Sequence, residues 1–204
     1  MSKKLIFKPH PWHGVPVGIG APGRVTAFIE MVPKDTCKYE IDKYSGYLKI
    51  DRPQKFSNII PALYGFIPQT YCGKKTANFA GEKSGRKLKG DGDPLDICVF
   101  TEREIPHGDI LVEVKVIGGM RMIDGGEADD KIIAVLAQDE VYSFTDIKEA
   151  PERLVNRLKH YFLTYKQLPG GEHAECEITH IYDSQEAKKV VQLSIEDYQD
   201  EFSE

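Results

Sequence analysis

Three aspartates stand close together in the segment KGDGDPLDICVF, residues 89–100. Asp91, Asp93 and Asp96 lead directly into an apolar run at 97–100. Aspartate, glycine and proline favour turns, so the simplest interpretation is a solvated turn that does no chemistry. However, Asp96 adjoins a segment that should be buried on at least one face, where an unpaired carboxylate is costly. The pattern therefore indicates that these carboxylates bind a cation.

A second acidic loop, DGGEADD at 124–130, lies between two apolar segments. It adds the carboxylates of Asp124, Glu127, Asp129 and Asp130, which brings the total for both loops to seven. If the loops converge, their like charges raise one another's pKa unless cations lie between them. Oxygen ligands select hard ions such as Mg²⁺, Mn²⁺ or Ca²⁺.

A calcium-binding EF-hand loop is the obvious competitor for the first acidic segment. Counted from Asp91, its fifth and sixth positions are Leu95 and Asp96. An EF-hand needs Asn or Asp at the fifth position and Gly at the sixth. The two loops therefore favour a site of the Mg²⁺ type.

Basic residues occur at the edges of the acidic segments. Lys38 and Glu40, two residues apart, would share one face of a strand, and Lys131 has the same relation to Asp129. Arg52 follows on the returning strand of a predicted hairpin, in a register that the sequence leaves open. Each basic residue taken alone fits a solvated surface group, but their joint placement beside the carboxylates does not.

Tyr165 and Lys166 end a predicted helix, where the lysine could also simply stabilise the negative end of the helix dipole. Carboxylates for metal ions, together with lysine, arginine and tyrosine for anionic oxygens, make up a phosphoryl-transfer site. That is the chemistry that these residue types predict.

The whole chain has the composition of a globular protein, with 204 residues, 41% hydrophobic and 29% charged. That length suits one well-buried core, so we expect a single domain over residues 1–204. The net charge of −5 argues against a general nucleic-acid binder. The four cysteines lie singly, without a C-x-x-C pair, and the basic N-terminus lacks an apolar signal core. We therefore expect a cytoplasmic protein with free thiols.

Most of the chain carries β signals that would position the site. Alternating or apolar segments predict strands at 24–32, 95–100, 110–123, 131–137 and 176–182, and a hairpin over 38–50. Gly118–Gly119 interrupts the longest strand and predicts a bulge or a barrel bend.

Two helices are predicted in the C-terminal half. Apolar residues recur at helical spacing in 151–168 and in 184–202, the latter with Ser184 as a candidate N-cap. Many short strands with late helices give a mainly β fold with flanking helices, a barrel or a sandwich.

Two segments are predicted to be irregular. The N-terminal arm, residues 1–23, contains GIGAPG at 18–23, but prolines precede this motif and a strand segment follows it, which argues against a dinucleotide-binding turn and favours a loop. The histidines and tryptophan of HPWHG (10–14) are interpreted as packing residues of this arm. The segment 73–90 carries six basic residues against one acidic, and we expect an exposed, mobile loop insertion.

The segment DGDPLDI (91–97) matches the D-x-D-P-x-D signature of soluble inorganic pyrophosphatases of the first, OB-fold family. Further segments resemble this family in the same order: FIEMVP (28–33), KYEIDK..SG (38–46), DRP (51–53), YGFIPQT (64–70), DGGEADDK (124–131) and YFLTYK (161–166). The resemblance runs from about Phe28 to Lys166. Two positions depart from the family pattern: Ile60 where many members have tyrosine, and Gly125 where glutamate is frequent.

The resemblance implies a five-stranded OB-type barrel with two C-terminal-half helices packed against it. It also implies Mg²⁺-dependent hydrolysis of pyrophosphate to two orthophosphates, with several Mg²⁺ per active site and Mn²⁺ as a substitute. Asp91, Asp96 and Asp129 resemble the ligands of one activating metal, and Asp96 resembles the bridge to a second. Asp124, with Asp129, resembles the ligands of a metal that the substrate brings. Further metals, held mostly through water, are implied for Glu30 and Glu40.

The resemblance also assigns the remaining site residues. Asp93 resembles the general base that accepts a proton from the attacking water, and Tyr64 resembles a tyrosine beside that base. The groups that resemble the phosphate-binding residues are Lys38, Arg52, Lys131, Tyr165 and Lys166.

The expected ligands are pyrophosphate and phosphate, with no nucleic-acid or membrane partner. Family members are commonly hexamers in bacteria and dimers in eukaryotes, so we expect a homo-oligomer, with the hexamer favoured over the dimer. One alternative is a two-metal phosphohydrolase acting on nucleotides or nucleic acid, which would need base-stacking aromatic residues beside the site. A second is an OB-fold binding module with structural Ca²⁺ loops, which would need a basic, aromatic groove.

Overall fold

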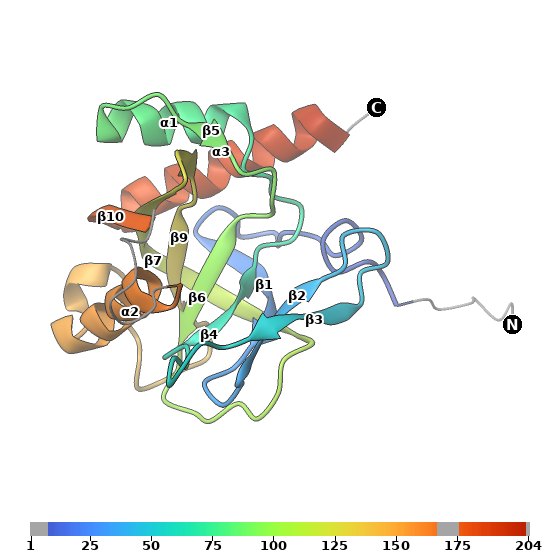
Figure 1. Cartoon of the computed structure of the whole chain (residues 1–204), viewed down its shortest axis with the longest axis vertical. Coiled ribbons are helices and arrows are strands. Elements are labelled where there is room, and N and C mark those ends of the chain that lie inside the picture. The colour runs from blue at the N-terminus through green and yellow to red at the C-terminus, as the bar shows by residue number, and fades with distance from the viewer. Residues whose placement is uncertain (1–7, 167–175, 203–204) are drawn as a thin grey trace, which may run out of the picture.

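A computed structural model describes residues 8–166 and 176–202, in which β-strands dominate and three α-helices flank them (Figure 1). The strands are β1 (Arg24–Met31), β2 (Cys37–Ile41), β3 (Leu48–Pro53), β4 (Leu63–Phe66), β5 (Lys89–Gly90), β6 (Asp96–Phe100), β7 (Ile110–Asp124), β8 (Glu127–Ala128), β9 (Lys131–Leu136) and β10 (Cys176–Asp183). The helices are α1 (Lys74–Ser84), the 3-10 helix η1 (Ile147–Glu149), α2 (Glu152–Thr164) and α3 (Ser184–Phe202).

Five strands form a ring in the order β1-β4-β6-β9-β7, because β7 pairs with β1 as well as with β9. Strands β10, β8 and β5 extend the sheet beyond the ring, so it is a partly closed ring rather than a clean barrel. Strands β2 and β3 form a separate two-stranded hairpin. The predicted mainly β fold with flanking helices, as in the OB-type barrel, is confirmed in this form.

The long strand β7 is where the ring opens into the extended sheet. Its register against β9 shifts between Val116 and Gly118, which confirms the predicted bulge. A Cβ atom at Gly118 would meet Ile147 and the backbone of Tyr182, and one at Gly119 would overlap the Tyr182 ring. The two glycines therefore let β7 bend while β10 packs tightly across it.

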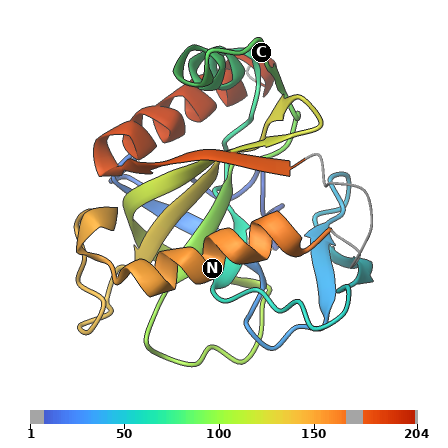
Figure 2. The same ribbon diagram turned by 60° about the vertical axis from the view of Figure 1, so that its left-hand side comes forward.

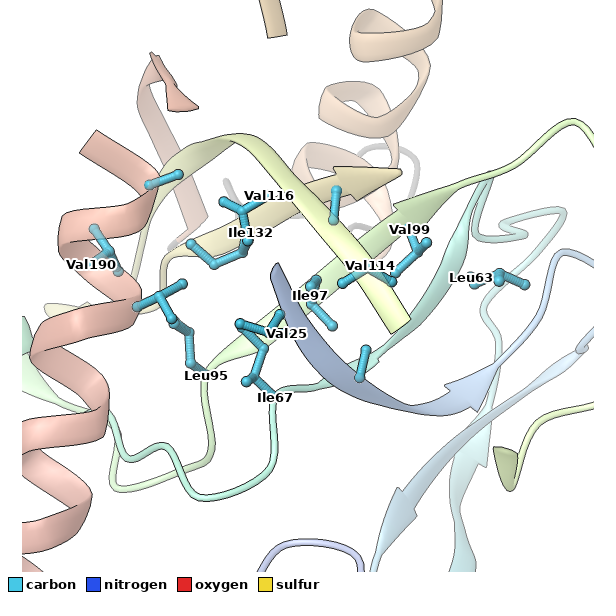
Figure 3. Close-up of a cluster of buried hydrophobic side chains, with 14 of the residues drawn as sticks. Val25, Leu63, Ile67, Leu95, Ile97, Val99, Val114, Val116, Ile132 and Val190 are labelled. Atoms are coloured by element: carbon cyan, nitrogen blue, oxygen red, sulfur yellow. The ribbon is translucent and has the colours of Figure 1, made fainter. Parts of the chain in front are cut away.

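The interior of the ring is filled by branched aliphatic side chains (Figure 3). Val25, Ile97, Val114 and Ile132 come from four different ring strands, and Val190 of α3 covers one end. Alternation along each strand directs these residues inward and leaves the opposite face for a second core beneath α2. Ile60 is fully buried in this second core.

The predicted strands and the two C-terminal helices are confirmed within the described residues, although the last part of the 151–168 segment, 167–168, lies outside them. Ser184 is not the N-cap of α3. The Asp183 carboxylate accepts hydrogen bonds from the N–H groups of Gln185 and Glu186 instead, at 3.2 and 3.1 Å. The N-terminal arm contains no helix or strand over residues 8–23, and Trp12 is packed into a small aromatic cluster, as predicted.

The prediction that 73–90 is an exposed, mobile loop is wrong. Residues 74–84 form helix α1, which lies against α3 on one side of the sheet (Figures 1 and 2). Its buried face consists of small residues: Thr76, Ala77, Ala80 and Gly81. Because these side chains are small, the helix has little apolar periodicity in its sequence. Its stability therefore depends on close packing against α3.

The N-terminus of α1 is capped by a residue from α3. The buried carboxylate of Asp197 accepts hydrogen bonds from the N–H groups of Gly73, Lys75 and Thr76 at 3.2, 2.9 and 2.8 Å. The acidic C-terminal segment is thus more than a solvated helix end.

Replacing Asp197 by alanine is expected to lower the free energy of unfolding by about 1–3 kcal/mol, because it leaves several helix N–H groups without an acceptor. Urea denaturation measures this change. Asp200→Ala is the matched control, since Asp200 is exposed on the same helix and forms a surface ion pair with Lys75. Equal stability of the two variants would contradict the capping role.

The described part of the chain contains no helix that is both long enough and apolar enough to cross a membrane.

Candidate active site

One cleft of about 270 Å³ gathers all thirteen residues that the sequence predicted for the site. It lies where the β2–β3 hairpin, the starts of β6 and β9, and the end of α2 meet. Helix α2 crosses the sheet with its C-terminal end directed toward the hairpin, which places the end of the helix at the cleft (Figure 2). The gathered residues are Glu30, Lys38, Glu40, Arg52, Tyr64, Asp91, Asp93, Asp96, Asp124, Asp129, Lys131, Tyr165 and Lys166.

The parallel pairing of β6 and β9 creates the centre of the site. Parallel strands begin at the same edge of a sheet, and the register places Asp96 beside Lys131 at that edge. The buried Lys131 ammonium group forms ion pairs with both Asp96 and Asp129. Burial alone would lower the pKa of Lys131, but the charges of Asp129 and Asp96 raise this pKa well above its usual value. The lysine therefore stays charged at the base of the cleft.

Tyr64 contacts Asp96 rather than Asp93. It lies on β4, which pairs with β6, and its hydroxyl donates to Asp96 Oδ2 at 2.6 Å. Burial, followed by the neighbouring Asp96 charge, raises the pKa of Tyr64 well above its usual value, so the phenol remains a donor. The resemblance placed this tyrosine beside the base; the structure connects it to a predicted metal ligand.

The loop before β6 presents Asp91 and Asp93. The Asp93 N–H donates to Asp91 Oδ1 at 2.9 Å, and Gly92 between them adopts a positive φ of 74°. Burial and the nearby Asp129 charge raise the pKa of Asp91 to about 8. The Asp93 carboxylate instead forms an ion pair with Lys43 at the rim.

The β2–β3 hairpin supplies a mixed group of charges. Its register places Arg52 opposite Lys38, which settles the pairing that the sequence left open. Lys38 pairs with Glu40, as their i, i+2 spacing predicts, and the Arg52 guanidinium lies 6.0 Å from the centre of the Tyr165 ring. The hairpin thus faces two cationic groups toward the cleft.

Glu30 is buried beneath this hairpin, where its Oε1 accepts from the Ile41 N–H at 2.8 Å. Burial raises its pKa to about 8.

At the opposite wall, Lys166 follows α2 and forms an ion pair with Asp124 at the end of β7. Burial would raise the pKa of Asp124, but the hydrogen bond from Lys166 lowers it below the usual value. Lys166 therefore faces the cleft and does not act merely as a helix-end charge.

Asp130 is the one member of the two acidic loops that the cleft does not include. It points behind β9 and is paired with the buried Arg121. The sequence alone could not distinguish Asp130 from its neighbours. Which side of the sheet each residue faces can be assigned only when the first residue of the strand is known.

Lys43 and Tyr161 also line the cleft, and sequence analysis assigned neither of them to the site. Glu127, one of the carboxylates of the second acidic loop, lines it as well. Lys43 lies in the turn of the hairpin, where a lysine is usually solvated. Tyr161 is part of the helical apolar stripe, and its hydroxyl accepts from Gln54 at 3.0 Å. Only the fold brings these groups to the site.

The cleft is suited to divalent cations that bind oxygen. It is lined by eight carboxylates and five cationic side chains, and burial raises the pKa values of two of these carboxylates, Glu30 and Asp91, to about 8. Within residues 8–166 and 176–202, no three aspartate, glutamate, histidine or cysteine side chains are arranged so that they could bind one metal ion together. Lysine ammonium groups pair with several of these carboxylates instead.

The raised pKa of Glu30 predicts how stability without metal depends on pH. The unfolded chain loses this proton near pH 4.5, whereas the folded chain keeps it until about pH 8. The folded state therefore binds more protons between these values, and the free energy of unfolding falls as pH rises through this range. Urea denaturation in EDTA at pH 5, 6.5 and 8 should show this decline.

Glu30→Gln should make the decline shallower, since the amide oxygen can still accept from Ile41 but carries no titrating charge. The exposed Glu140→Gln is the control and should follow the wild type. An unchanged slope in Glu30→Gln would show that another group causes the pH dependence.

Comparisons with known proteins agree with this site. A family model described as inorganic pyrophosphatase matches residues 27–199. An inorganic pyrophosphatase of Chlamydia muridarum is 48% identical over 204 residues, covering 97% of this chain and 98% of that protein. A soluble inorganic pyrophosphatase of Oryza sativa subsp. japonica is 35% identical over 199 residues, covering 97% of this chain and 83% of that protein.

The fold is shared with solved structures of the same name. A crystal structure of inorganic pyrophosphatase from Thermus thermophilus superposes with a TM-score of 0.77 at 31% identity, covering 94% of this chain and 99% of that one. These relatives support neither of the two alternative functions. The first was hydrolysis of nucleotides or nucleic acid, and the second was an OB-fold binding module. The chain belongs to the inorganic pyrophosphatase family.

Proposed function

We propose that the cleft hydrolyses inorganic pyrophosphate to two orthophosphates with Mg²⁺ as cofactor, several ions per site, and with Mn²⁺ able to substitute. The observation that carries this proposal is the convergence of all thirteen predicted residues on one cleft. Family membership supports the reaction, and the donor set supports the cofactor, because carboxylate oxygens are the ligands that Mg²⁺ prefers.

The metal-holding residues are proposed to be Asp91, Asp96, Asp124 and Asp129, with Glu30 and Glu40 holding further ions through water. When bound, these ions would neutralise phosphoryl charge and acidify the attacking water. Without them the carboxylates would repel a pyrophosphate anion, which explains why such an acidic cleft suits an anionic substrate only when it is loaded.

The cationic residues are proposed to bind and orient the two phosphates. Lys131 supplies a permanently charged ammonium group at the base of the cleft, while Arg52 and Lys38 supply charge from the hairpin. Tyr165 and Lys166 close the opposite wall. Preorganised positive charge of this kind stabilises the transition state of phosphoryl transfer without reorganisation during the reaction.

Asp93 is proposed as the general base. Its backbone is fixed on both sides, since its N–H donates to Asp91 and its carbonyl accepts from Cys72 at 2.8 Å. Its carboxylate reaches the rim of the cleft, where Lys43 is its ion-pair partner. A fixed carboxylate that remains half-exposed can accept a proton from the water and release it to solvent.

The test is release of orthophosphate from pyrophosphate by the purified, folded protein. We expect fast release with Mg²⁺, slower release with Mn²⁺, and background release in EDTA. ATP and bis(p-nitrophenyl) phosphate serve as competing substrates that represent nucleotide and diester hydrolysis. A folded protein that releases no phosphate from pyrophosphate with either metal, or that prefers either competitor, would contradict the proposal.

Two further parts of the proposal rest on the family resemblance and on the cysteines. We infer a homo-oligomer, a hexamer rather than a dimer, which light scattering of the purified protein measures directly. The four cysteines are free of disulfides, which suits a reducing, cytoplasmic setting.

A further inference from the structure

An arginine is completely enclosed behind the cleft. Arg121 lies on β7 with an exposed fraction of 0%, and its partner Asp130 has a side chain only 2% exposed. Arg121 Nη2 donates to Asp130 Oδ2 at 2.9 Å and Nε donates to Asp130 Oδ1 at 3.2 Å. The Tyr182 hydroxyl donates to the same carboxylate at 3.0 Å. This is a fork-shaped, fully desolvated ion pair.

Three further elements enclose the guanidinium group. Nη1 donates to Glu186 of α3 at 3.0 Å. The Tyr182 ring of β10 and the Phe79 ring of α1 lie 5.0 and 5.4 Å from the guanidinium carbon. Helix α1, the segment that the sequence left without a structural role, thus helps to exclude water from this pair.

The pair lies immediately behind the residues that face the cleft. Asp130 stands directly before β9, between Asp129 and Lys131. Both neighbours line the cleft while Asp130 is paired with Arg121 of β7, so this attachment helps to direct them toward the site. Backbone contacts to β7 lie on both sides of Asp130: the Asp129 N–H donates to the Met122 carbonyl at 3.0 Å, and Lys131 is paired with Met120. Arg121 is the residue of β7 between these two contacts.

Stability alone gives no strong reason to retain such a pair. Replacing both partners of a buried ion pair by apolar residues of similar volume is often neutral or stabilising, because two charges need no longer be desolvated. Geometry is a stronger reason. A forked guanidinium fixes both the distance and the rotation of the carboxylate that it binds, whereas apolar contacts do not.

We propose that the Arg121–Asp130 ion pair is a positioning device that holds Asp129 and Lys131 in the orientation needed for metal and phosphate binding. Arg121, Asp130 and Tyr182 are positioning residues, since none of them is among the residues that line the cleft. The proposal rests on the proposed function, which makes Asp129 a metal ligand and Lys131 a phosphate ligand.

The experiment compares four forms of the full chain: wild type, Arg121→Met/Asp130→Leu, Asp129→Asn, and the surface control Arg86→Met/Glu177→Gln. The control removes an exposed ion pair that also joins two segments of the fold. Three quantities are measured: the melting temperature, Mn²⁺ affinity by equilibrium titration without substrate, and kcat and KM for pyrophosphate with Mg²⁺.

We expect the buried double variant to melt at a lower temperature than wild type, because Glu186 and the Tyr182 hydroxyl lose their partners, and to bind Mn²⁺ about 10–100-fold more weakly, with a similar fall in kcat. The surface control should match wild type in all three. Arg121→Lys, which keeps the charge but not the fork, should bind Mn²⁺ less tightly than wild type and more tightly than the double variant.

Wild-type Mn²⁺ affinity in the double variant, together with weak binding in Asp129→Asn, would overturn the positioning role and leave the proposed function intact. Wild-type affinity in Asp129→Asn would overturn the positioning role together with the assignment of Asp129 as a metal ligand, whereas only a wild-type protein that releases no phosphate would overturn the proposed function. If the double variant does not fold, Tyr182→Phe decides the question, because it removes one hydrogen bond to Asp130 and keeps the ring. A Tyr182→Phe protein with wild-type Mn²⁺ affinity and kcat would then overturn the proposal.

Discussion

Asp93→Asn is expected to lower kcat for pyrophosphate hydrolysis about 10²- to 10⁴-fold while KM changes little. Asparagine has nearly the same shape, so the turn that joins residues 91 and 93 through the backbone N–H should persist. The amide cannot accept a proton from the attacking water. Phosphate release at saturating pyrophosphate and Mg²⁺ gives kcat, and thermal melting verifies the fold.

The matched control is Asp200→Asn, an identical change on the exposed face of α3. It should leave kcat unaltered. If Asp93→Asn retains kcat within about threefold of wild type, a far smaller loss than a missing general base causes, another group must accept the proton.

Lys131→Met is expected to lower kcat/KM about 10²- to 10³-fold, the effect of removing one preorganised charge from a transition-state site. Methionine fills most of the same space but leaves Asp96 and Asp129 without the ammonium group that pairs with both. Breaking such a pair is also destabilising, so the metal-free variant should lose about 3 kcal/mol of unfolding free energy.

A divalent cation should reverse part of the loss of unfolding free energy, because it can supply positive charge to the same two carboxylates. Urea denaturation in EDTA and in Mg²⁺ should therefore show a larger Mg²⁺-induced gain for Lys131→Met than for wild type. The exposed Lys189→Met is the control. Equal Mg²⁺ gains in the two proteins would show that the lysine and the metal do not act on the same carboxylates.

Local sequence was sufficient for most of the elements. Alternation of polar and apolar residues on both sides of Ser45–Gly46 predicts the β2–β3 hairpin, and the apolar spacing of Leu154, Leu158 and Phe162 predicts α2. Helix α2 is predictable because it buries one apolar face, whose period is set by backbone geometry. The hairpin is predictable from its alternation and turn residues, although its strands are only partly buried and Tyr47 and Ile50 are exposed.

Helix α1 shows where such reading fails. Its buried face is made of alanine, glycine and threonine, and its N-terminal cap, Asp197, lies on α3, more than a hundred residues along the chain. A helix stabilised by close approach and a distant cap leaves almost no periodic signal. Its basic residues Lys74 and Lys83 are exposed and Lys75 is partly exposed, so composition alone pointed to a loop.

The sequence by itself determined which chemical groups this protein has for phosphoryl transfer. Asp91, Asp93 and Asp96 are spaced for one loop, and no partner is needed to see that their charges require cations.

Only the tertiary structure decided which charges meet. The parallel register of β6 and β9 brings Lys131 between Asp96 and Asp129, and Asp130, directly before β9, pairs with Arg121 on the other side. These contacts depend on strand register and on which face each residue takes. Both are set by burial of the whole core, which no short segment of sequence contains.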